Sequence, residues 1–315
     1  MREATVIIPN YNGMVYLENC LESLRGQQCP VIVVDNGSSD GSIAFIKQQY
    51  PEVKLICLEK NYGFCRAVNE GIRASSTKYV ILLNNDTKVA ADFAEKLVEV
   101  MEKEKNIFSC QAKMLQMDHP DTIDDAGNLY CALGWAITRG KDAPAGRWCR
   151  RDKIFSACAG AAIYRRSIFE EIGYFDEAHF AYLEDVDIGY RARIAGYENW
   201  FEPQAVVYHK GSASTGARHN RFKVYHAARN NVYLIYKNMA RWQILLNLPL
   251  LLAGWILKAL FFTCKGMGFS YLRGLWGGVL LARKGEKTPF LAENFDNCWR
   301  IQRELWRNLL HFFPR

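Results

Sequence analysis

Short apolar runs alternate with amphipathic segments through residues 1–90, and this alternation restricts the chain to a few folds. Continuous aliphatic and β-branched runs are typical of buried strands, whereas apolar residues at helical spacing predict helices. The predicted strands cover 5–8, 31–34, 53–58 and 79–83, and the predicted helices cover 14–25, 42–49 and 65–74. Strands that alternate with helices form βαβ units, so we expect an α/β fold with a doubly wound sheet.

The pattern is less regular after residue 105. We expect a loop-rich insertion at 116–153, a helix at 184–195, and two short strands at 198–201 and 205–208. These elements extend the sheet without repeating its first βαβ pattern.

Polar residues follow three of the predicted strands, as Pro9-Asn10, Asp35-Asn36 and Asn84-Asn85-Asp86. In open α/β sheets ligands bind outside the carboxyl ends of the strands, so we expect these residues to meet in one crevice. No GxGxxG follows the first strand, which disfavours a dinucleotide-binding Rossmann domain, and no GxxxxGK[ST] is present, which excludes a P-loop.

Two acids at these strand ends suggest chemistry. The Asp35 carboxylate could accept the imide N–H of a pyrimidine base or a ribose hydroxyl, although an ordinary Asx turn would need the same residue. Asp86 could hold Mg²⁺ or Mn²⁺, because such ions bind through one or two carboxylates together with substrate phosphates. A simple turn is the alternative for Asp86 as well.

A second acidic group opens the helix predicted at 184–195. Glu184, Asp185 and Asp187 lie within four residues, and mutual repulsion should raise the pKa of at least one of them, which suits a general base. Asp187 and Arg191 are four residues apart and should form an ion pair. A solvated helix start is the alternative for this group. His209 follows a predicted strand and is either a metal ligand or a structural histidine.

The charge of the chain is unevenly distributed. Residues 1–204 hold 23 Lys and Arg against 29 Asp and Glu, whereas 205–315 hold 17 against 4. The basic part also contains the most apolar stretch, 244–264, with tryptophans beside it and basic residues around it. This pattern favours a helix pair that lies in or dips into the cytoplasmic leaflet over a helix that spans the membrane, for which the stretch is also long enough. A helical hairpin packed on the catalytic domain is the alternative. No known reader motif accompanies the basic residues, so a nucleic-acid partner is not expected.

Ten cysteines are scattered without a CxxC pair, and we expect them to be reduced thiols of an intracellular protein.

Six strings in this order resemble glycosyltransferase family 2, which has the GT-A fold, and more narrowly its bacterial rhamnosyltransferase-like branch. They are VIIPNYNG (6–13), VIVVDNGSSDGS (31–42), NYGFCRAVNEGI (61–72), YVILLNNDTKV (79–89), FDEAHFAYLEDVDIGYRARIAGY (175–197) and VVYHKGSAST (206–215). The resemblance implies a mixed sheet in a transferase domain at 1–215 and a C-terminal helical region at 216–315.

The resemblance also implies roles for particular residues. The residues expected to contact the nucleotide donor are Pro9, Asn10, Asp35, Asn61, Gly63, Asn84 and Asn85. Asp86 corresponds to the last Asp of the family's DxD motif and would hold a divalent metal, and His209 matches a histidine that joins the metal in some relatives. Asp185 would be the general base, with Glu184 beside it. Asp187 and Arg191 would contact the acceptor or orient the base. The sequence departs from the pattern at Asn84, where many members carry Asp.

The reaction implied is an inverting transfer of a sugar from dTDP-rhamnose or a UDP-sugar to a hydroxyl of a polyprenyl-linked or polysaccharide acceptor. We expect the enzyme at the cytoplasmic face of the membrane. Three other interpretations remain open: an inactive membrane-bound scaffold, favoured by Asn84; a sugar nucleotidyltransferase, which would need a glycine-rich basic loop where 9–13 lie; and a nucleic-acid binder that uses the basic half.

Overall fold

A ten-stranded mixed sheet forms the centre of the computed structural model, which describes residues 3–211 and 220–312. Its strand order is β10-β12-β6-β11-β4-β1-β2-β3, with β5 paired to β12 and β7 paired to β6. These strands are β1 (Ala4–Asn10), β2 (Val31–Asp35), β3 (Lys54–Cys57), β4 (Tyr79–Leu83), β5 (Thr87–Val89), β6 (Ile107–Gln116), β7 (Ile123–Asp125), β10 (Asp152–Ile154), β11 (Ala161–Arg165) and β12 (Glu198–His209). A separate hairpin joins β8 (Asn128–Tyr130) and β9 (Ala136–Thr138).

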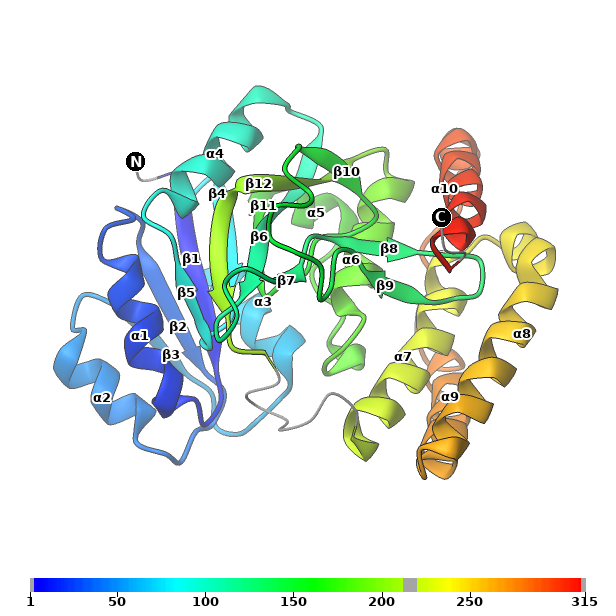
Figure 1. Cartoon of the computed structure of the whole chain (residues 1–315), viewed down its shortest axis with the longest axis horizontal. Coiled ribbons are helices and arrows are strands. Elements are labelled where there is room, and N and C mark those ends of the chain that lie inside the picture. The colour runs from blue at the N-terminus through cyan, green and yellow to red at the C-terminus, as the bar shows by residue number, and fades with distance from the viewer. Residues whose placement is uncertain (1–2, 212–219, 313–315) are drawn as a thin grey trace.

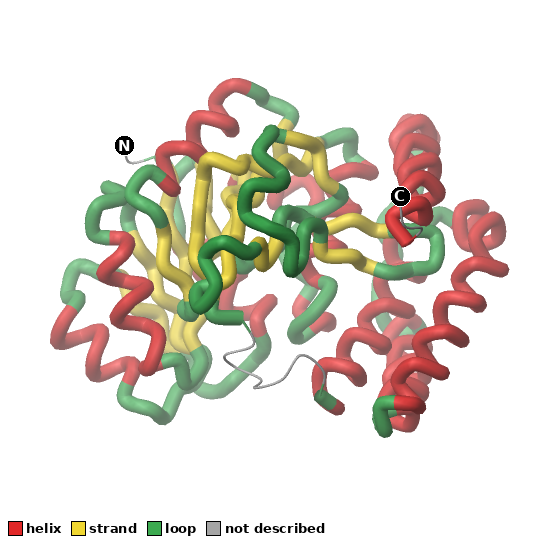
Figure 2. The backbone as a smooth tube through the Cα atoms, viewed as in Figure 1, coloured by secondary structure: helices red, strands yellow, loops and turns green. Residues whose placement is uncertain are grey.

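Helices cover both faces of the sheet, as Figure 1 and Figure 2 show. They are α1 (Met14–Leu24), α2 (Ser42–Gln49), α3 (Phe64–Ala74), α4 (Phe93–Lys103), α5 (Phe169–Ile172), α6 (Glu184–Ile194), α7 (Arg221–Asn238), α8 (Arg241–Cys264), α9 (Gly268–Ala282) and α10 (Phe295–Arg307). Successive strand residues point to opposite faces, so Val6 and Ile8 of β1 pack with α1 and α4, while Ile7 packs with α3.

The α/β class and the mixed GT-A sheet predicted from the sequence are confirmed. β3, β2, β1 and β4 run parallel, and β11 joins β4 in the antiparallel direction. Two details differ from the prediction. The strands expected at 198–201 and 205–208 form one strand, β12, because an irregularity between Glu202 and Val206 lets pairing with β6 resume. The insertion at 116–153 carries β7, β8 and β9 and the start of β10, because its short runs pair locally, β7 with β6 and β8 with β9, while β10 pairs with the more distant β12. All ten cysteines are free thiols, as expected.

The C-terminal helices share a hydrophobic core with the transferase fold. Tyr130, Phe155 and Tyr190 pack in one cluster with Leu234 of α7 and Leu251 of α8. Figure 1 shows α7 next to the sheet domain and α8 at the outer edge of the molecule. The domain boundary predicted between 215 and 216 lies in 212–219, outside the described residues.

Glycines let α9 lie directly against α7. A Cβ on Gly274 would lie 2.5 Å from the carbonyl oxygen of Tyr225, and one on Gly278 equally close to that of Arg229. Such close approach of backbones needs small residues at regular helical spacing. α8 and α9 thereby form a helical hairpin fixed to α7.

Candidate active site

One asparagine joins two of the predicted polar clusters at the sheet edge. Asn10 Nδ2 donates to Asp35 Oδ2 over 2.9 Å, and Asn85 Nδ2 donates to Asn10 Oδ1 over 2.7 Å. Gly13 makes room for this arrangement, because a Cβ there would lie 1.9 Å from Asn85 Nδ2. The carboxyl ends of β1, β2 and β4 therefore lie together at one edge of the sheet, as the parallel order of these strands requires, and this is the place predicted for the crevice.

The two oxygens of Asp35 each accept a hydrogen bond from the protein. Asn10 bonds to Oδ2, the backbone N–H of Ser38 bonds to Oδ1, and the side chain is fully buried. A carboxylate offers about four acceptor positions, but none of those on Asp35 is exposed in this structure, so its contact with a ligand stays a prediction. Pro9 lies one residue earlier in β1, opposite Val34 of β2, and is partly exposed.

Asn36 ties the end of β2 to the loop before α3. Its amide nitrogen donates to Asn61 Oδ1 and to the carbonyl of Gly63, and its oxygen accepts from the Tyr62 N–H. Asn61 also accepts the N–H of Gly63. The two residues predicted to bind the donor, Asn61 and Gly63, thus lie in a loop that these hydrogen bonds hold against the strand ends.

Asn84 closes the turn after β4. Its N–H donates to the carbonyl of Gly160, and its own carbonyl accepts from Thr87 Oγ1 over 2.6 Å. Gly160 leaves space for the side chain, since a Cβ there would lie 3.0 Å from Asn84 Nδ2. The backbone of Asn84 thereby fixes where Asp86 is presented.

His209 lies between two aspartates. Its Nε2 is 3.3 Å from Asp86 Oδ1, and its Nδ1 is 2.8 Å from Asp124 Oδ2. Burial disfavours the charged imidazole, but the hydrogen bonds to Asp124 and Asp86 prevail and raise the pKa of His209 to about 9. The predicted pair of Asp86 and His209 is therefore in contact, and Asp124 is its third member.

This arrangement fits a divalent cation in one respect. A cation would first have to displace the Nε2 proton that the raised pKa of His209 retains. With the other proton on Nδ1 and donated to Asp124, Nε2 would then face the ion beside Asp86, which is how carboxylates commonly orient metal-binding histidines. Within 3–211 and 220–312, however, no group of three or more His, Cys, Asp and Glu side chains is placed to hold a metal. The protein thus offers two ligands, and a substrate diphosphate would have to supply others.

The predicted base lies at the first turn of α6. Asn128 Nδ2, from β8, donates to Asp185 Oδ2 over 2.8 Å. Burial raises the pKa of Asp185 to about 6, and the nearby carboxylate of Asp125 adds to the rise. Since Asp125 follows Asp124 in the chain, the segment around β7 connects the His209 side of the crevice with the Asp185 side.

Glu184 has the more strongly perturbed carboxyl group. Burial, followed by repulsion from Asp185, raises the pKa of Glu184 to about 8, and its buried Oε2 has no hydrogen-bond partner among the described residues. Glu184 is therefore protonated at neutral pH. Mutual repulsion contributes to this rise, as predicted from the sequence, but desolvation is the larger cause.

Asp187 differs from its neighbours because it is fully buried and paired. The predicted ion pair with Arg191 is confirmed at 2.9 Å. Lys237 Nζ and Asn238 Nδ2, both from α7, bond to the same carboxylate. Burial alone would raise the pKa of Asp187, but the positive charges of Arg191 and Lys237 hold it far below its ordinary value.

Arg191, which pairs with Asp187, also binds the chain segment that precedes α6. Its guanidinium donates to the carbonyls of Ile172, Gly173 and Tyr174. Of the two roles predicted for Asp187 and Arg191, orienting the base suits these positions. A fully buried carboxylate is not available to touch an acceptor.

A strained loop carries the base. Phe180, Tyr182 and Leu183 have φ values of 63°, 74° and 65°, a backbone region that non-glycine residues rarely adopt. Asn230 of α7 donates to the carbonyls of His179, Ala181 and Tyr182.

The same loop touches the loop before α3. The N–H of Phe64 donates to the carbonyl of Phe180 over 2.7 Å, and a Cβ on Gly63 would lie 2.6 Å from that oxygen. Gly63, at a φ of 91°, thus lies where the predicted donor loop meets the loop of the base.

Four residues of this site were missed from the sequence: Asp124, Asn128, Asn230 and Lys237. The adjacent acids Asp124 and Asp125 in an otherwise irregular insertion were the only available signal. Asn128, Asn230 and Lys237 carry no local pattern, because their partners are 48 or more residues away in the chain.

Comparison with known sequences matches residues 5–173 to the family described as glycosyl transferase family 2. The chain belongs to this family. The chain is 25% identical over 270 residues to the N-acetylglucosaminyl-diphospho-decaprenol L-rhamnosyltransferase of Mycobacterium tuberculosis, covering 76% of the chain and 86% of that relative. It is also 23% identical over 204 residues to the poly-beta-1,6-N-acetyl-D-glucosamine synthase of Staphylococcus epidermidis, covering 63% of the chain and 47% of that relative. The predicted enzyme class, a nucleotide-sugar glycosyltransferase, is confirmed.

Solved structures share the fold. GalNAc-T7 with UDP, GalNAc and Mn²⁺ superposes with a TM-score of 0.60 at 17% identity, covering 75% of this chain and 48% of that one. A mannosyltransferase from Pyrobaculum calidifontis in complex with GDP-Man and Mn²⁺ gives 0.54 at 17% identity, covering 90% and 87%. At these identities the likeness establishes the GT-A fold alone.

The substitution Asn230→Ala tests whether the hydrogen bonds of Asn230 keep the loop before Asp185 in its conformation. Three hydrogen bonds to the strained segment are lost, so Asp185 should lose its alignment, and sugar transfer should fall about 10²-fold while donor affinity is kept. Turnover and donor binding are measured separately, by product formation and by the ligand-induced rise in melting temperature.

Gln27→Ala is the matched control. The buried Gln27 amide also makes three hydrogen bonds to backbone, with Ala90, Ala91 and Ala94, far from the crevice. It should lower stability and leave the rate per folded molecule unchanged. Equal losses of activity in the two variants would show that Asn230 matters only for folding.

Proposed function

We propose that the protein is an inverting glycosyltransferase of cell-surface glycan synthesis. It moves a sugar, with rhamnose as the first candidate, from a nucleotide-diphosphate donor such as dTDP-rhamnose or a UDP-sugar to a hydroxyl of a lipid-linked or polysaccharide acceptor. One observation carries the proposal. Asn10 and Asp35 are hydrogen-bonded at one side of the crevice, and Asp86 and His209 are in contact beside them. Asp124 contacts His209, and its neighbour in the chain, Asp125, is close enough to Asp185 to raise the pKa of that carboxyl group.

The position of each predicted residue in the crevice suggests which part of the donor it would contact. Pro9, Asn10, Asp35 and the loop of Asn61 and Gly63 would hold the nucleotide, with Asn84 and Asn85 next to the diphosphate. Rhamnose is favoured by the mycobacterial relative, which is named an L-rhamnosyltransferase, and its decaprenol-linked substrate favours a lipid-linked acceptor.

Asp185 would remove the proton of the acceptor hydroxyl. With a pKa of about 6 it is mostly ionised at neutral pH and still basic enough to accept a proton. Asn128 bonds to one carboxylate oxygen and thereby orients the other. Protonated Glu184 adds no negative charge beside it. The acceptor oxygen then attacks the anomeric carbon from the side opposite the diphosphate, and the configuration inverts.

Asp86 and His209 would hold a Mg²⁺ or Mn²⁺ ion, with Asp124 keeping the imidazole in the required tautomer. Such an ion, when bound, supplies positive charge that stabilises a diphosphate leaving group. Structural neighbours with Mn²⁺ and a nucleotide or nucleotide sugar support this assignment.

Asp185→Asn should lower turnover about 10²–10⁴-fold, because the proton acceptor is lost, and donor binding should survive. In the wild type the rate should rise as pH increases through about 6, since Asp185 must be deprotonated to act. Turnover measured against pH at saturating substrates tests both the loss in Asp185→Asn and the rise of the wild-type rate. Glu184→Gln, which keeps that side chain neutral, should preserve the rise in rate near pH 6. Transfer by Asp185→Asn at the wild-type rate would refute the assignment.

Asp86→Ala should abolish the effect of Mn²⁺ on donor affinity. A panel of dTDP-rhamnose, UDP-sugars and GDP-mannose, with Mn²⁺ or EDTA, is read as the rise in melting temperature. Asp92→Ala, an exposed aspartate at the start of α4, is the control and should behave as wild type. An unchanged Mn²⁺ effect in Asp86→Ala would contradict the metal site.

The C-terminal helices would attach the enzyme to the cytoplasmic face of the membrane. α8 is the one helix among the described residues that is long and apolar enough to cross a bilayer, with mean hydropathy 2.0 and 17% of its apolar window buried. Its exposed face continues onto α9 with Phe269 and Trp276.

The buried face of α8 is fastened to the rest of the protein. Gln243 and Asn247 bond to Gln302 of α10, and the carbonyl of Gly254 accepts from Trp135. A helix fixed to its own domain along more than half its length is better suited to lie in the interface than to span it.

Phe269→Glu combined with Trp276→Glu should release the protein from anionic vesicles, because two large apolar side chains of the proposed membrane face become charged. Sedimentation with phosphatidylglycerol vesicles at low salt measures the bound fraction. Val15→Glu, which alters an equally exposed apolar residue on α1, should not change it. If the wild type ignores such vesicles, the helices serve only the fold.

A further inference from the structure

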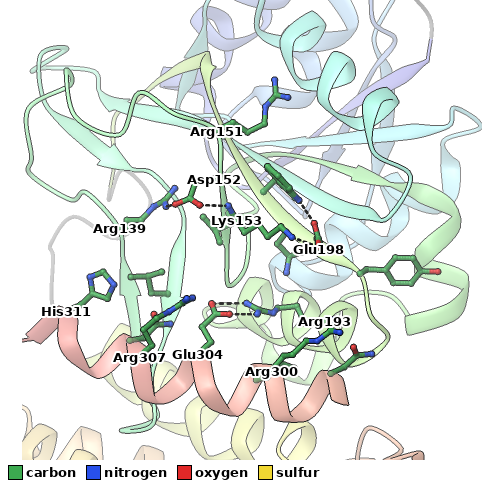
Figure 3. Close-up of a pocket in the computed structure, with 18 of the residues that line it drawn as sticks. Arg139, Arg151, Asp152, Lys153, Arg193, Glu198, Arg300, Glu304, Arg307 and His311 are labelled. Atoms are coloured by element: carbon green, nitrogen blue, oxygen red, sulfur yellow. Dashed lines mark hydrogen bonds and ion pairs between the residues drawn. The ribbon is translucent and has the colours of Figure 1, made fainter. Parts of the chain in front are cut away.

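A second cavity, of about 720 Å³, lies between α10 and the edge of the sheet formed by β10 and the first residues of β12 (Figure 3). It is separate from the crevice described above. α6 begins at the crevice with Glu184 and Asp185 and reaches the cavity with Arg193. The eight residues from Asp185 to Arg193 correspond to about 12 Å along the helix.

Positive charge dominates this cavity. Its lining contains six Lys and Arg residues but three Asp and Glu residues, as Arg139, Arg151, Lys153, Arg193, Arg300, Arg307 and Asp152, Glu198, Glu304. Four of the cations have acidic partners: Arg139 with Asp152, Arg151 with Glu202, Lys153 with Glu198 and Arg193 with Glu304. Figure 3 shows the last pair joining α6 to α10 across the cavity.

Arg300 and Arg307 supply the excess charge. They lie seven residues apart, two turns along one face of α10, and neither forms an ion pair within 3–211 and 220–312. Arg139, in the opposite wall, is 5% exposed, pairs with Asp152 and packs against the rings of Trp148 and Phe201, so it offers no open donor to the cavity. Exposed arginine forks, such as those of Arg300 and Arg307, bind phosphate oxygens in bidentate geometry.

The position of the cavity indicates the source of the phosphate. The neighbouring flank of α10 exposes Phe295, Trp299 and Trp306, aromatic side chains of the kind found at membrane interfaces. A lipid held in the interface by its chain would therefore bring its head group to the basic face of the same helix. Arg300 and Arg307, which have no acidic partner in the part of the chain that the structure describes, suit a negatively charged diphosphate better than a neutral sugar.

We propose that this cavity binds the diphosphate of a lipid-linked acceptor, with Arg300 and Arg307 as its principal ligands. The inference rests on the proposed function, because it assigns the anionic end of the acceptor to this cavity and leaves the reacting hydroxyl to Asp185. Since Asp185 and Arg193 are about 12 Å apart along α6, it requires an acceptor whose glycan is long enough to reach from the cavity to Asp185. The donor nucleotide occupies the crevice, so the two diphosphates have separate sites.

The test compares Arg300→Ala/Arg307→Ala with Arg303→Ala in the full-length protein. All three arginines are exposed on α10, but Arg303 lies outside the cavity lining, so Arg303→Ala controls for the loss of an exposed positive charge from this helix, and each single variant, Arg300→Ala and Arg307→Ala, is compared with it at equal charge. Binding of farnesyl diphosphate, inorganic pyrophosphate and farnesol is measured by calorimetry with EDTA present, which removes any contribution from a metal-dependent crevice.

We expect the double variant to bind farnesyl diphosphate at least about tenfold more weakly than wild type, because two charge-assisted contacts are lost. Arg303→Ala should bind it as wild type does, and farnesol should not distinguish the proteins. Equal affinity of the double variant and Arg303→Ala for farnesyl diphosphate would overturn the proposal. A loss confined to pyrophosphate would overturn the lipid source and leave a site for free anions.

Donor binding by the same variants separates the two proposals. Since the cavity does not hold the nucleotide, the donor-induced rise in melting temperature should be the same in wild type and in the double variant. If the cavity proposal fails while donor binding persists, the transferase assignment stands. If no nucleotide sugar binds any of the proteins, the proposed function fails, whatever the lipid result shows.

Discussion

The buried carboxylate of Asp187 is the interaction on which the arrangement of the active site depends. It is removed from water and surrounded by Arg191, Lys237 and Asn238. A buried charge that loses one partner typically destabilises a protein by about 3–5 kcal/mol, so this carboxylate fixes α6 against α7. Because Asp185 lies two residues earlier, in the first turn of α6, the same interaction fixes the proposed base.

The contacts of Asp187 help to keep the loop before α6 in a strained backbone conformation. Three non-glycine residues at positive φ directly precede Glu184, and each such residue is costly in isolation. Asn230 and the N–H of Phe64 hold their carbonyls from two sides. The loop is thereby attached both to α7 and to the loop of Asn61 and Gly63. Backbone strain of this kind persists only where the surroundings over-determine it, and here the surroundings come from both halves of the chain.

Local sequence pattern predicted most of the sheet and the crevice at its edge. The strands β1, β2 and β4 are continuous apolar runs, and their parallel order brings Asn10, Asp35 and Asp86 to one side without further information. The pattern could not supply Asn128 or Asn230, because an amide that serves a distant backbone leaves no periodic trace. It also treated Glu184, Asp185 and Asp187 as one acidic group, whereas burial and pairing give them opposite pKa shifts.

The same reasoning changes how the basic C-terminal part is understood. An excess of Lys and Arg after residue 205 predicted a membrane partner, but part of it has partners inside the protein. Lys237 neutralises Asp176 and Asp187, and Arg229 donates to the carbonyls of Ala178 and His179. Some of the basic residues of the helices therefore serve the interior of the protein, as partners of buried carboxylates and of backbone carbonyls. Two of the α10 arginines that have no ion-pair partner among the described residues, Arg300 and Arg307, line the cavity in which we propose that an anion binds.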